Sequence, residues 1–389
     1  MAVVSLSDPD FLIDPYPAIT EHRSRGVVPN LDHGGWWVLD SEAILRLIRD
    51  PGSASDPEVA DPDAPITKVF KQARLSMFYM DPPEHTRVRG SVKADFTPRA
   101  VAGLEGRITD TALELLDGLP DSGRIDIVAS YGDLLSMTVM SDFLGVEPER
   151  RDEFRKWTLT RIRGMFNPKL STTEQFAEST ERLRSYFSQR IADARRAPVG
   201  GLIDRLLSSG ALSHDEMVDL LIIMLGAGII TTADLIGNTV HALLTHPTEL
   251  DALRADPSLV PVAIEETLRF DSPALSAGRI LTADAELFGT PMPAGTWLRL
   301  MTAAIGRDPA RNPDPDRYRL ERERREHAAF GGGLHHCLGL HLGRLEATVA
   351  LRLLLERYPD FELADTTTPA SRRGIPGFRG FDHLLIDVA

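Results

Sequence analysis

Cysteine is the scarcest residue in this chain of 389 residues, because Cys337 is the only one. A single thiol excludes an internal disulfide and a zinc site with two or more cysteine ligands. It also excludes the set of cysteines that holds an iron–sulfur cluster. Any metal or redox chemistry at Cys337 must therefore use one sulfur atom.

Positive charge and long apolar runs are also scarce. The formal net charge is −14, which argues against binding to nucleic acid or to an anionic membrane, since both need a basic face. The longest apolar run, residues 220–230, is about half of the roughly 20 residues that a membrane-spanning helix needs. The N-terminal sequence has no basic segment followed by an apolar core. We expect a soluble, cytoplasmic protein.

The sequence also lacks a glycine-rich flavin or nicotinamide fingerprint, internal repeats and a flexible linker. We therefore expect one domain over residues 1–389, with no built-in reductase. Periodicity predicts a mainly α-helical protein with a small β-rich region. The helix-rich body is expected at about 85–270 and 325–360, and the β-rich parts at about 25–75 and 275–305. The predicted helices include 104–119, 136–144 and 180–195, and the predicted strands include 35–39 and 298–302.

The most distinctive predicted helix begins after a capping box formed by Ser213 and Glu216 and runs to Pro247. Apolar residues occur on all its sides, so we expect most of it to be buried. Gly226 and Gly228 lie in its interior, where each glycine costs about 1 kcal/mol relative to alanine. Two explanations remain open: close packing against another helix, or space for a flat ligand beside the helix backbone.

A glycine-rich loop precedes Cys337, and a long helical segment follows it. Gly331 and Gly333 permit tight left-handed turns, and Gly339 permits close approach of another backbone or of a ring system. We expect Cys337 to lie in the first turn of the helix, where the helix dipole and free N–H groups would lower the pKa of the thiol. Phe330 would form an apolar wall against the sulfur.

Two other roles for Cys337 are open on these residues alone. An isolated cysteine is more often a buried small hydrophobic residue. A zinc site would use neighbouring histidines, but two of them are adjacent and point in different directions, and no H-E-x-x-H or C-x-x-C pair accompanies them. The candidate zinc ligands are His327, His335, His336, Cys337 and His341.

The loop resembles the haem-binding loop of cytochromes P450, written F-G-x-G-x-H-x-C-x-G, at all six fixed positions. The resemblance implies the cytochrome P450 fold, with haem b between the long central helix and the helix after the cysteine, and with Cys337 as the iron ligand. It also implies that Phe330, Gly331 and Gly339 contact the cofactor. The matching residues are Phe330, Gly331, Gly333, His335, Cys337 and Gly339.

Two further sets of residues match motifs of this family. Glu266 and Arg269 match its E-x-x-R pair, and the resemblance implies a structural lock that Arg317 joins. Without the resemblance, this would be an exposed helical ion pair worth about 0.2–0.5 kcal/mol. Four residues match the positions that bind the haem propionates, for which arginine is chemically suited. They are His85, Arg89, Arg279 and His335.

The long helix resembles the family's oxygen-binding signature A-G-x-[Asp/Glu]-T-T. The resemblance implies that the helix opens beside the iron and that Thr231 hydrogen-bonds dioxygen or an ordered water. Ile230 replaces the usual acid, and isoleucine can neither donate a proton nor organise water. We expect Thr231 to work with water and either Asp234 or a polar group of the substrate; the alternative is a reaction that uses peroxide or fewer relayed protons. The matching positions are Ala227, Gly228, Ile230, Thr231 and Thr232.

The same resemblance implies that electrons come from a ferredoxin and its reductase, unless peroxide replaces them. Basic residues that flank the haem-binding segments would form a local docking site despite the acidic net charge. Each of them is, by itself, an ordinary solvated surface charge. The candidates are Arg87, Lys93, Arg99 and Arg344.

The segments that contact substrate in this family are mostly apolar here, which favours a small, mostly hydrophobic organic substrate. We expect hydroxylation in the biosynthesis of a secondary metabolite. O-demethylation, aromatic coupling and a catalytically inactive haem-binding protein are the alternatives. The segments are residues 76–79, 163–169, 225–229, 274–277 and 375–378.

Overall fold

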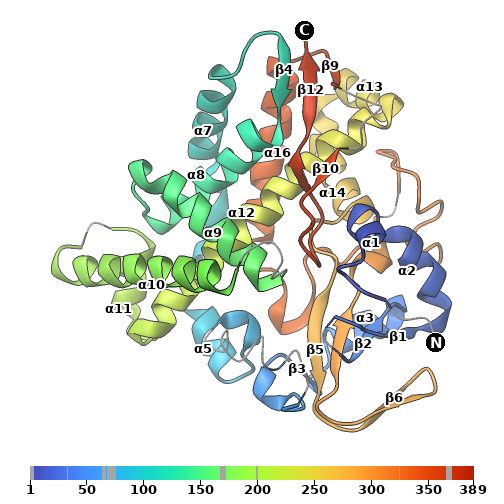
Figure 1. Cartoon of the computed structure of the whole chain (residues 1–389). Helices are drawn as coiled ribbons and strands as arrows, with labels where there is room; N and C mark the ends of the chain where they lie inside the picture. The colour runs from blue at the N-terminus through green and yellow to red at the C-terminus, as the bar shows by residue number, and fades with distance from the viewer. Residues whose placement is uncertain are drawn as a thin grey trace.

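The computed structural model describes residues 4–32, 34–63, 67, 76–166, 172–198, 200–323, 325–364 and 370–389. Helices form most of it, and α12 and α16 pass through its middle (Figure 1). The helices are α1 (Pro9–Ile13), α2 (Tyr16–His22), α3 (Ser41–Leu47), α5 (Glu84–Gly90), α6 (Pro98–Ala102), α7 (Glu105–Asp117), α8 (Asp133–Leu144), α9 (Arg151–Phe166), α10 (Thr173–Arg196), α11 (Leu202–Ser209), α12 (His214–Leu244), α13 (Pro247–Ala255), α14 (Val260–Phe270), α15 (Ala303–Gly306) and α16 (Leu340–Arg357).

The strands form small sheets, of which the largest has the order β1-β2-β8-β5-β3. This sheet pairs two segments far apart in sequence, because β2 lies parallel to β8 and β3 antiparallel to β5. A second sheet has the order β4-β12-β9. The strands are β1 (Val27–Pro29), β2 (Trp36–Val38), β3 (Ser53–Ala54), β4 (Gly123–Asp126), β5 (Ala277–Leu281), β6 (Ala285–Leu287), β7 (Thr290–Met292), β8 (Trp297–Leu300), β9 (Phe361–Leu363), β10 (Ser371–Arg372), β11 (Phe381–His383) and β12 (Leu385–Val388).

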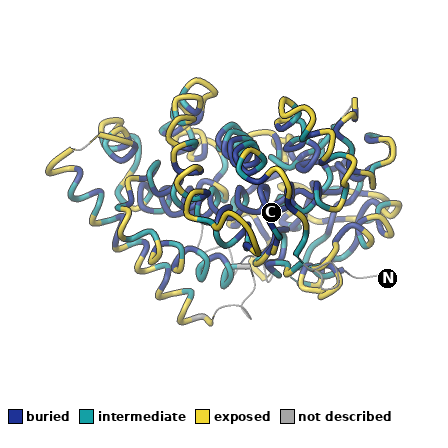
Figure 2. The backbone as a smooth tube through the Cα atoms, turned by 90° about the horizontal axis from the view of Figure 1, so that it is seen from above, coloured by how far each residue is buried: buried dark blue, intermediate teal, exposed yellow. Residues whose placement is uncertain are grey.

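The predicted fold class, mainly α with a small β-rich region, is confirmed. Each of the three predicted helices is present, as α7, α8 and α10. Helix α10 begins seven residues earlier than predicted, after a capping box in which Thr172 accepts the N–H of Gln175. The two predicted strands are β2 and β8. Figure 2 shows buried positions gathered toward the middle of the molecule, with exposed positions on the outer turns.

Helix α12 is the central element of the helical body. Its capping box forms as predicted: the Ser213 hydroxyl accepts the N–H of Glu216 at 3.3 Å, and the Glu216 carboxylate accepts the N–H of Ser213 at 2.8 Å. The helix is long and apolar enough to cross a membrane, but 72% of its most apolar window is buried inside the protein. It ends at Leu244, and Pro247 opens the next helix.

The two interior glycines of α12 allow close packing between helices. A Cβ atom added to Gly228 would lie 2.5 Å from Sδ of Met140 in α8, and one added to Gly226 would lie 3.1 Å from Cδ1 of Ile162 in α9. Since α12 is helical without interruption from His214 to Leu244, the expectation that it opens beside the iron is wrong. Packing against α8 and α9 accounts for both glycines.

Candidate functional site

The loop before α16 holds Cys337 in a defined position. The N–H of Cys337 donates to the carbonyl of Phe330 at 2.9 Å, and Gly331 and Gly333 have φ values of 68° and 63°. A Cβ atom at Gly333 would lie 2.5 Å from the backbone oxygen of Ile48, so this position needs glycine on two grounds.

Helix α16 begins at Leu340, so Cys337 lies three residues before it and not in its first turn as predicted. Burial raises the pKa of the Cys337 thiol, although the backbone N–H of Gly339 and the charges of Arg89 and Arg344 favour the thiolate. The N–H at the helix start thus lowers the pKa of the thiol as expected, but the effect of burial is larger and the net pKa is raised. In this environment a bound cation, such as a metal, would stabilise the thiolate.

The four predicted propionate-binding residues come together from three parts of the chain. The rings of His85 and His335 lie 4.2 Å apart, and the Nε2 atoms of both are buried with no hydrogen-bond partner in the described part of the chain. Burial and the nearby charges of Arg279, His85 and Arg89 lower the pKa of His335 to about 3.

Within the described residues, the two arginines of this cluster donate hydrogen bonds to backbone oxygens and to no side chain. Arg89 donates to the carbonyl of His336 at 2.6 Å, and Arg279 donates to Gly278 at 2.7 Å and to Ile48 at 3.2 Å. Burial lowers the pKa of both guanidinium groups. Two cations and two orphaned imidazole nitrogens are an environment that carboxylates would neutralise, so these residues fit the propionates of a haem.

The residues proposed for a zinc site do not converge. His335 faces His85, whereas Nε2 of His327 lies 3.2 Å from Glu265, which also pairs with Arg344. Within the described residues, no three His, Cys, Asp or Glu side chains are grouped to hold a metal ion. Arg344 also stacks on Phe330, with its Cζ atom 4.4 Å from the ring centre, and so fixes the apolar wall beside the cysteine.

Glu266 and Arg269 form a buried, bidentate ion pair with N–O distances of 2.9 and 2.8 Å, and both side chains have no exposed surface. The third side chain in this lock is Arg322, whose Nε atom lies 3.1 Å from Glu266. The prediction of Arg317 is wrong: its side chain is exposed, and only its backbone carbonyl accepts hydrogen bonds, from Arg269 and Arg322. Spacing alone could not separate two arginines five residues apart.

On α12, the residues of the predicted oxygen-binding signature divide between two faces. The Thr231 hydroxyl donates to the carbonyl of Ala227 at 2.7 Å, and Thr232 is buried toward Gly343 of α16. Ile230 is fully buried in an apolar cluster. The cluster consists of Ile162, Ile230 and Ile375, with Leu159 and Phe378 packed against them.

Asp234 lies one turn after Ile230 on the same helix face. Its Oδ1 atom lies 2.5 Å from Nε of Arg373, whose Nη2 atom lies 2.6 Å from Asp133, while its Oδ2 atom is buried without a partner in the described chain. Burial raises the pKa of Asp234 to about 6, against the opposing effect of Arg373. Sequence patterns gave no indication of Arg373, because it joins Asp234 only through the tertiary fold.

Two of the predicted substrate segments meet. Residues 274–277 and 375–378 are linked by a β-bridge between Ala274 and Phe378 and by a 3.0 Å hydrogen bond from Leu275 to Gly377. Ile375 also contacts Ile230 within the apolar cluster, so these turns adjoin α12. Of the segment 163–169, residues 167–169 lie outside the described residues.

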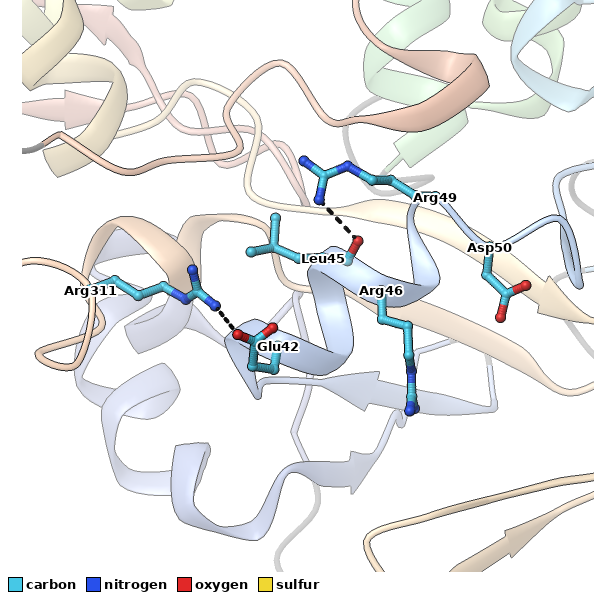
Figure 3. Close-up of a pocket in the computed structure, with 6 residues that line it drawn as sticks. All are labelled: Glu42, Leu45, Arg46, Arg49, Asp50 and Arg311. Carbon is cyan, nitrogen blue, oxygen red and sulfur yellow. Dashed lines mark hydrogen bonds and ion pairs between the residues drawn. The ribbon is translucent and has the colours of Figure 1, made fainter.

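Two surface hollows flank the cysteine loop. One, of about 490 Å³, lies along α3 and is lined by Glu42, Leu45, Arg46, Arg49, Asp50 and Arg311. Figure 3 shows Arg311 paired with Glu42 and Arg49 bonded to the carbonyl of Leu45. The second, of about 310 Å³, includes Phe330, His336 and Arg344. Sequence reasoning missed Arg46 of α3 and Arg49 just after this helix, which only the fold brings to this loop.

Comparison with known proteins identifies the family. Residues 152–374 match the family model "Cytochrome P450". The chain is 40% identical over 315 residues to cytochrome P450 107B1 of Saccharopolyspora erythraea, covering 80% of this chain and 76% of that protein. It is 31% identical over 402 residues to 6-deoxyerythronolide B hydroxylase of the same organism, covering 99% and 98%.

A solved structure of the myxobacterial cytochrome P450 CYP267B1 with myristic acid superposes with a TM-score of 0.92 at 31% identity, covering 99% of this chain and 98% of that one. The cysteine loop and the cation cluster beside it agree with these matches. The family binds haem through a cysteine thiolate, and this chain has one cysteine. The chain belongs to the bacterial cytochromes P450, monooxygenases whose haem iron is bound here by Cys337.

Proposed function

We propose that this enzyme hydroxylates a small, mostly hydrophobic organic molecule in secondary-metabolite biosynthesis, in the cytoplasm and with electrons from a ferredoxin and its reductase. The observation that carries the proposal is the placement of Cys337 beside the cluster of His85, His335, Arg89 and Arg279. The hydroxylase of Saccharopolyspora erythraea, which is similar over nearly the whole chain, supports the type of reaction.

The chain's residues would hold the cofactor from two directions. Arg89, Arg279 and the two histidines would bind its carboxylates, and Cys337 would bind its iron. When bound, the haem supplies a thiolate-ligated iron at which one atom of O₂ is inserted into a C–H bond. Phe330, held by Arg344, keeps the sulfur side apolar.

On the opposite side, proton supply depends on residues other than the missing acid. The Thr231 hydroxyl donates to the carbonyl of Ala227 and has lone pairs that accept a proton or a water. Asp234, whose raised pKa of about 6 brings it closer to neutral pH than an ordinary aspartate and so suits it to exchange a proton, is the nearest acid along the same face. We assign proton delivery to Thr231 and Asp234 through water, and pocket shape to Ile230.

Electrons would enter at the cysteine-loop side. Arg46, Arg49 and Arg311 line the hollow beside this loop, and Arg344 lines its neighbour. The side chain of Arg49 lies close to the loop, since a Cβ atom at Gly332 would be 3.9 Å from its Nε atom. These cations favour a partner with an acidic docking face.

The absence of an acid at position 230 favours a second candidate reaction, in which peroxide replaces O₂ and electrons.

The decisive experiment is the carbon-monoxide spectrum of the reduced enzyme, followed by turnover with either a ferredoxin system or peroxide. We expect the red-shifted Soret band of thiolate ligation in the wild type and its loss in Cys337→Ser. Product from the ferredoxin system and none from peroxide supports the proposal. A spectrum without the red shift would reject it, and bound substrate without turnover by either route would indicate an inactive haem-binding protein.

A further inference from the structure

Arg299, in β8, is a buried cation that has no carboxylate within 4.0 Å among the described residues. Its side chain is 9% exposed. Its Nη1 atom donates to the Ser276 hydroxyl at 3.1 Å, and its Nε atom is buried with no hydrogen-bond partner in the described structure. The acid that most affects it, Asp32, already accepts the Ser5 hydroxyl at 2.6 Å and the N–H of Leu6 at 2.5 Å.

The other buried arginines show how unusual this is. Seven arginines are buried in the described residues, and five of them have an Asp or Glu oxygen within 4.0 Å. The two exceptions are Arg279, which fits a carboxylate of the cofactor, and Arg299. Burying an unpaired charge is costly, and desolvation lowers the pKa of Arg299 to about 10. A retained buried cation therefore indicates an anion other than the described residues, and a bound ligand can supply it.

Arg299 lies beside segments that are predicted to contact the substrate, so the anion that it binds would belong to the substrate. Ser276 belongs to one predicted substrate segment, and Gly377, where a Cβ atom would lie 3.7 Å from Nη1 of Arg299, belongs to a second. Tyr79, from a third segment, is close enough for the two groups to shift each other's pKa. Burial raises the pKa of Tyr79, so its phenol stays neutral beside an anion.

Apolar side chains lie between Arg299 and α12. Gly377 is followed by Phe378, which packs with Ile375 against Ile230. A ligand with an anionic end at Arg299 would thus place its apolar part along these side chains. The isoleucine at position 230 suits such a ligand, since a carboxylate there would repel a negative charge and wet the pocket.

We propose that Arg299 and Ser276 bind the carboxylate of an amphipathic substrate whose apolar body extends along Ile375 and Phe378 toward Ile230. The inference rests on the proposed function and narrows its substrate class from hydrophobic molecules to hydrophobic carboxylic acids. The guanidinium donates to the carboxylate, and the serine hydroxyl, which accepts from Arg299, donates its own hydrogen to the same group.

The test is a titration of the haem-loaded enzyme, followed by the shift of its Soret band, with acids and their methyl esters. Dodecanoic acid and naphthaleneacetic acid are the probes, at about pH 7.5, where carboxylic acids are ionised. We expect at least one acid to bind about tenfold or more tightly than its ester, because the ester leaves a buried cation unpaired. Arg299→Gln should reduce this preference to less than about threefold.

The control is Arg317→Gln, which changes an exposed arginine and should keep the full preference for the acid. If Arg299→Gln does not fold, the affinities for acid and ester are compared in Arg299→Lys and in the wild type, and these two comparisons test the carboxylate site. Neither acid binding more tightly than its ester, or a preference that persists in Arg299→Gln, would overturn the carboxylate site. Either result with a red-shifted carbon-monoxide band leaves the proposed function intact, whereas loss of that band counts against the function itself.

Discussion

Buried charges in this chain are held by networks, and the E-x-x-R lock is the clearest case at the scale of single residues. Glu266 accepts from Arg269 and Arg322, and the two arginines in turn bind backbone carbonyls of the segment that precedes the cysteine loop. Removing one partner from such a network leaves another charge buried and unpaired, which costs more than the pair itself contributes.

Arg322→Gln should therefore destabilise the protein by about 3–5 kcal/mol and lower the fraction of enzyme that retains haem. Arg317→Gln should change stability by less than about 0.5 kcal/mol, because its side chain is exposed. Urea unfolding and the haem-to-protein absorbance ratio measure both. A larger effect of Arg317→Gln than of Arg322→Gln would show that Arg317, not Arg322, completes the lock.

Another buried acid, Glu346, has no cationic partner within 4.0 Å among the described residues. Glu346 of α16 is 1% exposed, and burial raises the pKa of its carboxyl to about 7. Because the folded state holds this proton more tightly than the unfolded state, its effect on stability is most favourable below about pH 4.5 and is lost as the pH rises through about 7. We expect Glu346→Gln to raise the free energy of unfolding at pH 8 by up to about 3 kcal/mol. If the free energy of unfolding of this variant depends on pH as that of the wild type does, the raised pKa of Glu346 is contradicted.

The proton assignment is also a residue-scale prediction. Asp234→Asn and Thr231→Ala should each lower the amount of product per reducing equivalent, because proton delivery would fail while electrons are still consumed. Ile230→Asp should change the same ratio by restoring an acid. Coupling that is unaffected by Thr231→Ala and Ile230→Asp would remove both residues from the proton pathway.

At the scale of elements, α12 owes its position to its small residues. Because Gly228 has no side chain, Met140 of α8 packs where the Cβ atom of another residue would lie. Ile162 of α9 packs closely against Gly226 in the same way. Each interior glycine destabilises an α-helix by about 1 kcal/mol relative to alanine. Close packing of α12 against its neighbours offsets this cost.

Gly228→Ala should consequently destabilise the protein by about 1–3 kcal/mol through overpacking. Gly106→Ala, in the exposed first turn of α7 where no atom lies within 4 Å of the added Cβ, should be neutral or stabilise by up to about 1 kcal/mol. Thermal unfolding compares the two. If the helix glycine instead serves a bound ligand, Gly228→Ala would weaken haem or substrate binding with little change in the stability of the apoprotein.

At the scale of the whole molecule, an acidic protein carries a local basic face. The net charge is −14, yet the hollow beside the cysteine loop is lined by three arginines, Arg46, Arg49 and Arg311, against two acids, Glu42 and Asp50. Arg311 is paired with Glu42 and Glu326, so Arg46 and Arg49 carry the local positive charge. Local charge steers a partner over roughly a Debye length, about 8–10 Å at physiological salt, so the net charge does not prevent docking here.

Ferredoxin-supported turnover should fall by roughly tenfold when ionic strength is raised from low to about 0.5 M salt. Arg49→Glu should lower the turnover at low salt several-fold, without changing the Kd of substrate. Arg182→Glu on α10, far from the loop, is the matched control and should have no effect. Turnover insensitive to salt and to Arg49→Glu would place electron entry elsewhere.

The sequence by itself determined the helical class, the capping box of α12, the cysteine loop and the family. These features are local: a cap, a glycine turn or a fixed spacing uses residues that are close in the chain, and their chemistry needs no distant partner.

Only the tertiary structure decided which distant groups meet. It replaced Arg317 by Arg322 in the lock, set Cys337 before α16 rather than within it, and showed that Gly228 packs on Met140. It also brought Arg373 to Asp234 and left Arg299 buried with no carboxylate partner in the part of the chain that the structure describes. Burial and long-range pairing depend on how the elements pack, and no spacing in the sequence of this chain records that packing.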